Sequence, residues 1–191
     1  HPDMDRYNGI YRRTWYRNQI LMHKLQSVVG MLGSRQIDTM LLKGSAMIVG
    51  YYADHGVRSM NDFDVLVPVH QVRDVIDLLA SSEWHTEFPT VASRIRFTHS
   101  MLFKDAGGHD FDLHWHMMEE CCLPEAEQAV WAHAIPVRVG PVLTHLPHHT
   151  DHLIHTLVHG LRWEQVSPIR WVADSVTILR RAGSGGVDWD R

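Results

Sequence analysis

The chain has 191 residues, of which 45% are hydrophobic, enough for one compact domain or a catalytic core with a small helical addition. A net charge of −4 gives no global basic field, which argues against an enzyme that works on long nucleic acid. No apolar run approaches the ~20 residues of a membrane helix, and the two cysteines are adjacent, so we expect a reduced, cytoplasmic protein without a membrane partner.

The first third of the chain predicts a helix, a short strand and a second helix. Apolar residues recur at three- and four-residue steps from Tyr11 to Leu32, which is typical of an amphipathic helix that ends near Gly33. Residues 39–42 form an apolar run that predicts a buried strand. A helix is expected over 46–52.

The middle of the chain predicts strands and the end predicts helices. This order favours an α+β fold with a mixed sheet, residues 1–146, followed by a C-terminal helical subdomain, residues 147–191, whose abrupt end indicates a truncated chain. The expected elements are a strand at 63–67, a helix opened by Pro68 to about 82, a strand at 84–88, a hairpin of 95–104 with 110–115, a helix at 124–131, a small hairpin of 137–139 with 142–143, and helices at 148–161 and 168–181.

Two carboxylates on one strand are the most informative local feature. Residues i and i+2 of a strand face the same side, so Asp62 and Asp64 project together while Phe63 and Val65 face the other way. Adjacent carboxylates repel unless a cation compensates, and Mg²⁺ prefers oxygen ligands. By itself the pair fits equally a solvated strand end, or the sugar-nucleotide metal motif of a glycosyltransferase.

Two further features favour a phosphate and metal site. Gly44 and Ser45 follow a strand and precede a helix, where backbone N–H groups can meet a triphosphate, although a plain turn with Ser45 as N-cap fits the same residues. Downstream, Asp112 adds a third carboxylate on the same strand face as Asp110 and deeper in the strand. Three carboxylates can bridge two Mg²⁺ ions.

These residues together resemble a known superfamily. A Gly-Ser turn, a strand with Asp-x-Asp and a later lone Asp are similar to the signature of the DNA polymerase β-like nucleotidyltransferases. The strings 42–46 and 62–67, with Arg58 between them, resemble the uncharacterised bacterial nucleotidyltransferase family 5. Residues 159–163 and 169–174 extend the resemblance, which covers about 35–180.

The resemblance implies a nucleotidyltransferase catalytic core at 1–146 that attacks the α-phosphate of an NTP with an acceptor oxygen and releases pyrophosphate. The acceptor would be a hydroxyl or phosphate on a small molecule, peptide or protein. Asp62, Asp64 and Asp112 would be catalytic and would bind Mg²⁺ or Mn²⁺. The nucleotide would be bound by four residues, Lys43, Gly44, Ser45 and Arg58.

Histidines and aromatic residues in the C-terminal part have two interpretations each. A stripe with spacings of 4, 3 and 4 favours a helix face packed on the catalytic part, with zinc binding as the alternative. The tryptophans favour a core role over base stacking, Asp174 is expected to cap a helix or pair with an arginine, and His114 fits either a substrate contact or packing. The stripe is His148, His152, His155 and His159, and the aromatic group is Trp163 and Trp171 with Arg162 and Arg170.

Two other functions compete with nucleotidyl transfer. A non-catalytic module that binds nucleotide or a partner would not need all three carboxylates, so their presence argues against it. A glycosyltransferase would need a larger nucleotide-binding domain before Asp62 than the 61 preceding positions allow.

Overall fold

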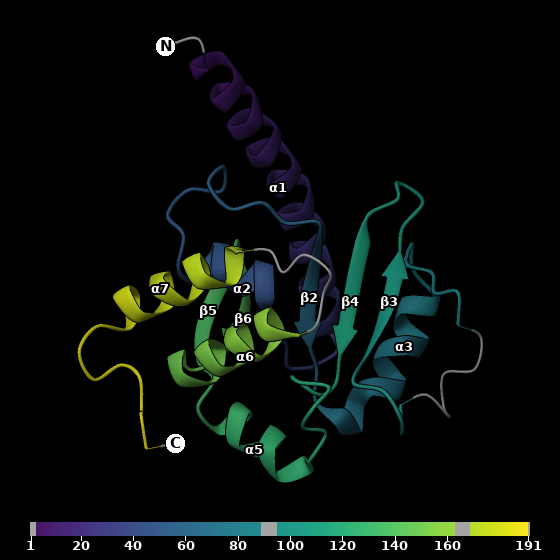
Figure 1. Cartoon of the computed structure of the whole chain (residues 1–191). Helices are drawn as coiled ribbons and strands as arrows, with labels where there is room; N and C mark the ends of the chain where they lie inside the picture. Colours follow the sequence, from purple (N-terminus) through teal and green to yellow (C-terminus); the bar gives the residue numbers. More distant parts are fainter. Residues whose placement is uncertain (1–2, 89–94, 163–168, 191) are drawn as a thin grey trace.

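One mixed sheet of six strands carries helices on both faces (Figure 1). The structure is a computed structural model that describes residues 3–88, 95–162 and 169–190. The strand order is β3-β4-β2-β1-β6-β5. The elements are α1 (Met4–Gly33), β1 (Met40–Leu42), α2 (Lys43–Gly50), β2 (Asp62–Leu66), a 3₁₀ turn η1 (Val69–Gln71), α3 (Val72–Ala80), β3 (Ser100–Lys104), β4 (Asp110–His114), α5 (Pro124–Ala132), β5 (Ile135–Val139), β6 (Val142–Leu146), α6 (His149–Leu161) and α7 (Arg170–Ala182).

The pairing of the central strands brings distant parts of the chain together. β2 pairs antiparallel with β1 and parallel with β4, so the sheet is mixed, as expected. In the β2–β4 register Asp64 lies opposite Asp112, and Asp62 lies opposite Asp110. Each of the two expected hairpins, β3–β4 and β5–β6, joins this sheet at one of its edges.

The two faces of the sheet differ in chemistry. Phe63, Val65, Phe111 and Leu113 are buried on the face that α1 and α3 cover, and the rings of Phe63 and Phe111 stack with centroids 5.0 Å apart. Trp84 closes this cluster against both rings. Alternation along β2 and β4 therefore directs the aspartates to the opposite face, as the sequence predicts.

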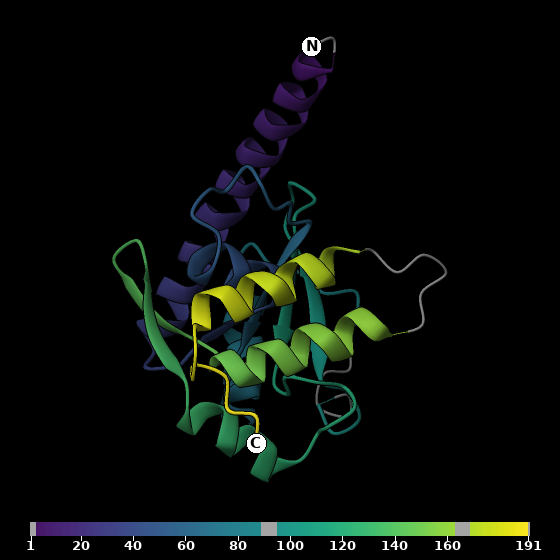
Figure 2. The ribbon, with the colours of Figure 1, turned by 60° about the vertical axis from the view of Figure 1, so that its left-hand side comes forward.

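The opposite face carries the C-terminal helices. α6 and α7 lie side by side in front of the sheet, and both are shown in Figures 1 and 2, while the N-terminal half of α1 projects beyond the other elements. Met47 and Tyr51 of α2 pack with Leu153 of α6 and Ile178 of α7. This apolar contact packs α6 and α7 against α2, the helix that follows β1. Within the described ranges no helix has the length and apolarity to cross a bilayer.

Three expected boundaries were wrong. The second helix begins at Lys43 rather than at residue 46, because β1 runs into it without an intervening turn. The region 84–88 forms a single bridge, from His85 to Lys104, because Trp84 turns into the core instead of extending a strand. β3 begins only at Ser100, and Ile95 lies in a turn; residues 89–94 lie outside the described part of the chain.

Candidate active site

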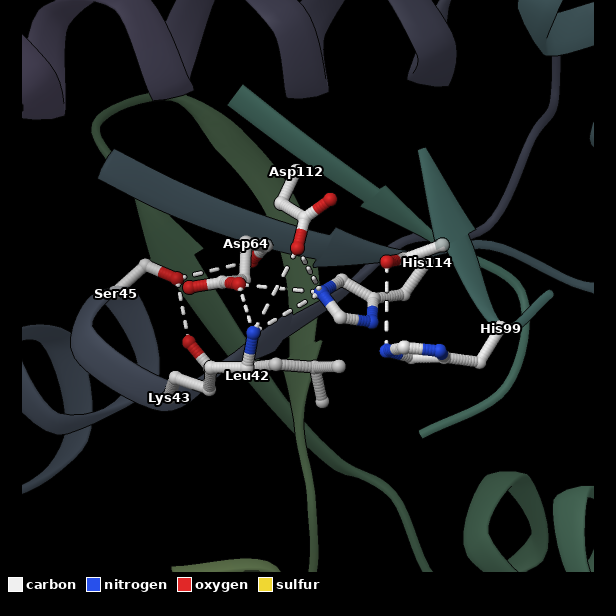
Figure 3. Close-up of polar contacts among 8 residues, drawn as sticks. Leu42, Lys43, Ser45, Asp64, His99, Asp112 and His114 are labelled. Carbon is white, nitrogen blue, oxygen red and sulfur yellow. Dashed lines mark hydrogen bonds and ion pairs between the residues drawn. The ribbon is translucent and has the colours of Figure 1, made fainter. Parts of the chain in front are cut away.

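Asp64 and Asp112 converge on one point from neighbouring strands. Asp64 is buried at the centre of β2, and Asp112 is partly exposed at the equivalent position of β4. The two carboxylates share a hydrogen-bonding partner, because His114 Nε2 lies 3.1 Å from Asp64 Oδ1 and 3.1 Å from Asp112 Oδ2 (Figure 3). Asp112, and not Asp110, is therefore the aspartate of β4 that joins Asp64; Asp110 instead lies 3.8 Å from Lys104.

Lys43 supplies the positive charge for this pair of carboxylates. Its Nζ lies 2.7 Å from Asp64 Oδ1 and 3.7 Å from Asp112 Oδ2. Its side chain points into the site, and Figure 3 shows the ammonium between the two carboxylates and the imidazole. The local backbone is unusual, because Lys43 has a φ of 43°, in the left-handed region that non-glycine residues rarely adopt.

The charges perturb one another in a consistent way. Burial alone would raise the pKa of Asp64, but Lys43 and His114 outweigh it and lower that pKa. Burial likewise opposes the charged forms of Asp112 and His114, yet their mutual hydrogen bond lowers the pKa of Asp112 and raises the pKa of His114. The site therefore favours two ionised carboxylates and a protonated imidazole.

The pKa of Asp62 is shifted in the opposite direction to the pKa values of Asp64 and Asp112. Asp62 is half-buried, and burial together with the charge of Asp64 raises its pKa to about 6. Lys43 acts in the opposite direction but more weakly. A carboxylate held in this way is stabilised by any added cation.

A cavity of about 230 Å³ opens next to the aspartates. It lies between the start of α2, the strand β2 and the helices α6 and α7, so segments about a hundred residues apart in the sequence contribute to its wall. Its lining includes Lys43, Gly44, Arg58, Asp62 and Asp64 among the expected site residues. Ser45 and Asp112 are adjacent but do not line it.

Gly44 and Ser45 occupy the first turn of α2, and their roles differ. A Cβ atom at Gly44 would lie 2.7 Å from Arg58 Nη1, so a glycine is needed for Arg58 to approach the helix. The Ser45 hydroxyl is buried and donates to the carbonyl oxygens of Leu42 (2.8 Å) and Asp64 (3.0 Å). It therefore ties α2 to β2. At Gly44 and Ser45, therefore, the backbone N–H groups remain as the groups that could donate hydrogen bonds to a phosphate.

Arg58 reaches the cavity but already has an anionic partner. Its Nη2 lies 2.9 Å from Asp174 Oδ2, and its Nε is 3.4 Å from the other carboxylate oxygen. Tyr52 donates a further hydrogen bond to Asp174, at 2.9 Å. The expected pairing of Asp174 with an arginine is confirmed, and the pair links α7 to the loop before β2.

The histidine stripe on α6 packs toward the catalytic part. His152 and His155 are buried, and His155 and His159 line the cavity. Among the described residues, the group of three potential metal ligands within 4.8 Å of one another is Asp64, Asp112 and His114, with no member from α6. The packing interpretation agrees with this arrangement.

The aromatic group divides between the cavity and the surface. Trp171 is partly buried, packs against Gly160 and lines the cavity with Arg170, so a core role describes it only in part. Arg162 pairs with Glu120 at 2.8 Å on the surface. Trp163 lies outside the described residues. Sequence periodicity cannot distinguish a cavity wall from a core, because both require apolar helix positions.

The donor set fits a divalent cation. Asp64 and Asp112 converge with His114 within 4.8 Å, and carboxylate oxygens are the ligands that Mg²⁺ and Mn²⁺ prefer. Asp62 lines the neighbouring cavity but does not belong to this group of three. The ammonium of Lys43 already occupies the place of a cation beside Asp64 and Asp112. Sequence reasoning did not predict that His114 bridges Asp64 and Asp112. The available signal was its position two residues after Asp112, which places both side chains on the same strand face.

Solved structures with similar folds are nucleotidyltransferases. The solution structure of the antibiotic-resistance factor ANT(2'')-Ia has a TM-score of 0.63 at 8% identity and covers 88% of each chain. The lincomycin-bound lincosamide antibiotic adenylyltransferase LnuA has a TM-score of 0.54 at 12% identity, over 82% of this chain and 94% of its own. At these identities the likeness shows the fold.

A third solved structure has a similar fold, and a family model matches the sequence. An antigenic nucleotidyltransferase-like protein from Paracoccidioides brasiliensis has a TM-score of 0.51 at 13% identity, over 83% of this chain and 74% of its own. No curated protein matches the sequence. The family described as "Uncharacterised nucleotidyltransferase" matches residues 5–191. Because that match spans nearly the whole sequence, the chain belongs to this family of nucleotidyltransferases.

Proposed function

We propose that the protein is a Mg²⁺- or Mn²⁺-dependent enzyme that transfers a nucleoside monophosphate from an NTP to a hydroxyl or phosphate of an acceptor. The acceptor is a small molecule, a peptide or a protein. The observation that carries the proposal is the convergence of Asp64 and Asp112, from two strands, beside the N-terminus of α2 and the cavity.

The reaction exchanges one P–O bond for another. The acceptor oxygen forms a bond to the α-phosphorus, the bond from that phosphorus to the β-bridging oxygen breaks, and pyrophosphate leaves. The backbone N–H groups at the start of α2 bind phosphate oxygens. Asp112, at the more exposed side of the pair, orients the acceptor hydroxyl and takes its proton.

Asp62, Asp64 and Asp112 would hold the metal. When bound, it supplies charge neutralisation for the phosphates and activation of the acceptor oxygen. His114 fixes the two carboxylates in place through its shared Nε2 contact, as a positioning residue. Lys43 and Arg58 contribute positive charge at the cavity wall.

The adjacent free cysteines, Cys121 and Cys122, support a reducing cytoplasmic location.

Transfer of label from an α-³²P NTP tests the proposal. The protein is incubated with each NTP, Mg²⁺ and a cell extract, and labelled product and pyrophosphate are measured. Asp64→Asn should remove both signals, while the matched control Asp110→Asn, on the neighbouring strand but paired with Lys104, should retain them. Tight NTP binding by the wild type without any product would instead support the non-catalytic module.

A further inference from the structure

The ammonium of Lys43 lies among the atoms that would bind a metal ion. Its Nζ is 2.7 Å from Asp64 Oδ1, 3.7 Å from Asp112 Oδ2 and 3.4 Å from His114 Nε2. The oxygens of Asp64 and Asp112 belong to the described group of three potential ligands. Figure 3 shows the lysine entering this group from the start of α2.

The backbone of Lys43 holds the side chain in this position at a cost. A left-handed φ is uncommon for a residue with a Cβ atom, and such conformations persist when the surrounding structure enforces them. Here the enforcing contacts are the carboxylate pair in front and the Ser45 hydroxyl, which ties the first turn of α2 to β2 behind it. The strain is therefore located at the residue that neutralises the site.

We propose that Lys43 is an internal counter-ion that excludes a divalent cation from Asp64 and Asp112 until the triphosphate of an NTP draws its ammonium away. The inference rests on the proposed function and adds the order in which the ligands bind. Lys43 thereby determines that metal and nucleotide bind together.

The Lys43 ammonium, 2.7 Å from Asp64 Oδ1, and a divalent ion bound to the same oxygen would compete for space and repel each other in this poorly solvated site. A metal ion that binds without nucleotide must therefore displace the ammonium, which leaves a lysine without its partner. The triphosphate removes this penalty because its oxygens supply a new anionic partner. Lys43 borders the cavity, so its flexible stem has space to turn toward a ligand there.

The coupling works in both directions. If nucleotide increases the affinity for metal by freeing the carboxylates, metal must increase the affinity for nucleotide by the same factor.

Mn²⁺ binding to the nucleotide-free protein tests the inference. The dissociation constant is measured by electron paramagnetic resonance in the wild type, Lys43→Met and Lys43→Arg. We expect Lys43→Met to bind Mn²⁺ at least about tenfold more tightly, and Lys43→Arg to stay within about threefold of the wild type, because only the first removes the competing charge. Lys43→Gly, in which the left-handed backbone is unstrained, replaces the methionine variant if that variant does not fold.

The chain offers a matched control in a second buried ion pair. Lys24 pairs with Asp105, and its side chain is 19% exposed, compared with 23% for Lys43. The pair lies outside the candidate site, so Lys24→Met should leave Mn²⁺ affinity unchanged. A gain in Lys24→Met equal to that in Lys43→Met would mean that net charge, and not the position of Lys43, sets the affinity, and would overturn the inference.

The nucleotide side of the exchange has its own measurement. Affinity for a non-hydrolysable ATP analogue, measured by calorimetry with Mn²⁺ present, should fall at least about tenfold in Lys43→Met, because the triphosphate has lost the ammonium with which it would pair. Equal or weaker Mn²⁺ binding by nucleotide-free Lys43→Met would overturn the inference. Mn²⁺ binding that is unaffected by Asp64→Asn would instead refute the metal site, and with it the proposed function.

Discussion

Replacement of Asp62 by asparagine should stabilise the metal-free protein while it abolishes activity. The pKa of Asp62 rises from 3.8 to about 6, through burial and the charge of Asp64. A raised carboxyl pKa means that the folded state holds the proton more tightly than the unfolded state. Its favourable contribution is complete below 3.8 and is lost as the pH rises through about 6. Above that pH the ionised Asp62 side chain destabilises the folded state, whereas asparagine stays neutral.

The expected gain in the free energy of unfolding follows from the pKa shift of Asp62. Two pKa units correspond to about 3 kcal/mol at about 1.36 kcal/mol per unit. Asp62 is partly exposed, so solvent screens part of this, and about 1–2 kcal/mol is expected. For a protein of this size the melting temperature should rise by about 3–6 °C.

Urea denaturation in EDTA measures the effect at two pH values. Asp62→Asn should be more stable than the wild type at about pH 8 and no more stable at about pH 3, below both pKa values, where the wild-type carboxyl is mostly protonated in both states. Asp62→Glu, which keeps the charge, is the matched control and should show no gain. A stability difference that is equal at the two pH values, or a loss at the higher one, would refute the electrostatic reasoning.

Four further predictions concern other parts of the site and its support. Asp112→Ala should reduce turnover by orders of magnitude and change nucleotide affinity less than about threefold, in steady-state kinetics and calorimetry; a large loss of affinity would contradict its placement on the acceptor side. Arg58→Met should lower the free energy of unfolding by about 3 kcal/mol in urea denaturation, because it leaves the buried Asp174 carboxylate without its cationic partner. A second change, Asp174→Leu, should recover part of the loss; additive effects would disprove the coupling. Burial lowers the pKa of His152 to about 3, so protonation favours unfolding and stability should fall as the pH drops from 6.5; His152→Leu should weaken this dependence, and an unchanged pH profile would count against it. Elemental analysis should find no stoichiometric zinc, whereas one zinc per chain that is lost in His155→Ala would show that the stripe binds metal.

The sheet face of each aspartate could be predicted from the sequence alone. Alternation along β2 and β4 separates Asp62, Asp64 and Asp112 from Phe63 and Phe111, because a strand places successive side chains on opposite faces. The β3–β4 hairpin, which carries Asp112, was also predictable, because the glycines of its turn are a local signal.

The start of α2 shows where local patterns stop being sufficient. A strand followed by Gly44 and Ser45 suggested a turn, yet the helix begins at Lys43 and the serine hydroxyl binds a carbonyl of β2. That bond depends on β1 and β2 being neighbours. No spacing within the motif encodes it.

The sequence by itself determined which residue types the site contains and which strand face each carboxylate occupies. Tertiary structure decided their partners: Lys43 turns inward to Asp64, His114 bridges Asp64 and Asp112, and Arg58 is held by Asp174 from a helix more than a hundred residues later. The physical reason is that periodicity arises from backbone geometry over a few residues. Ion pairs between elements depend on strand register and on the docking of α7, which only the packed chain defines.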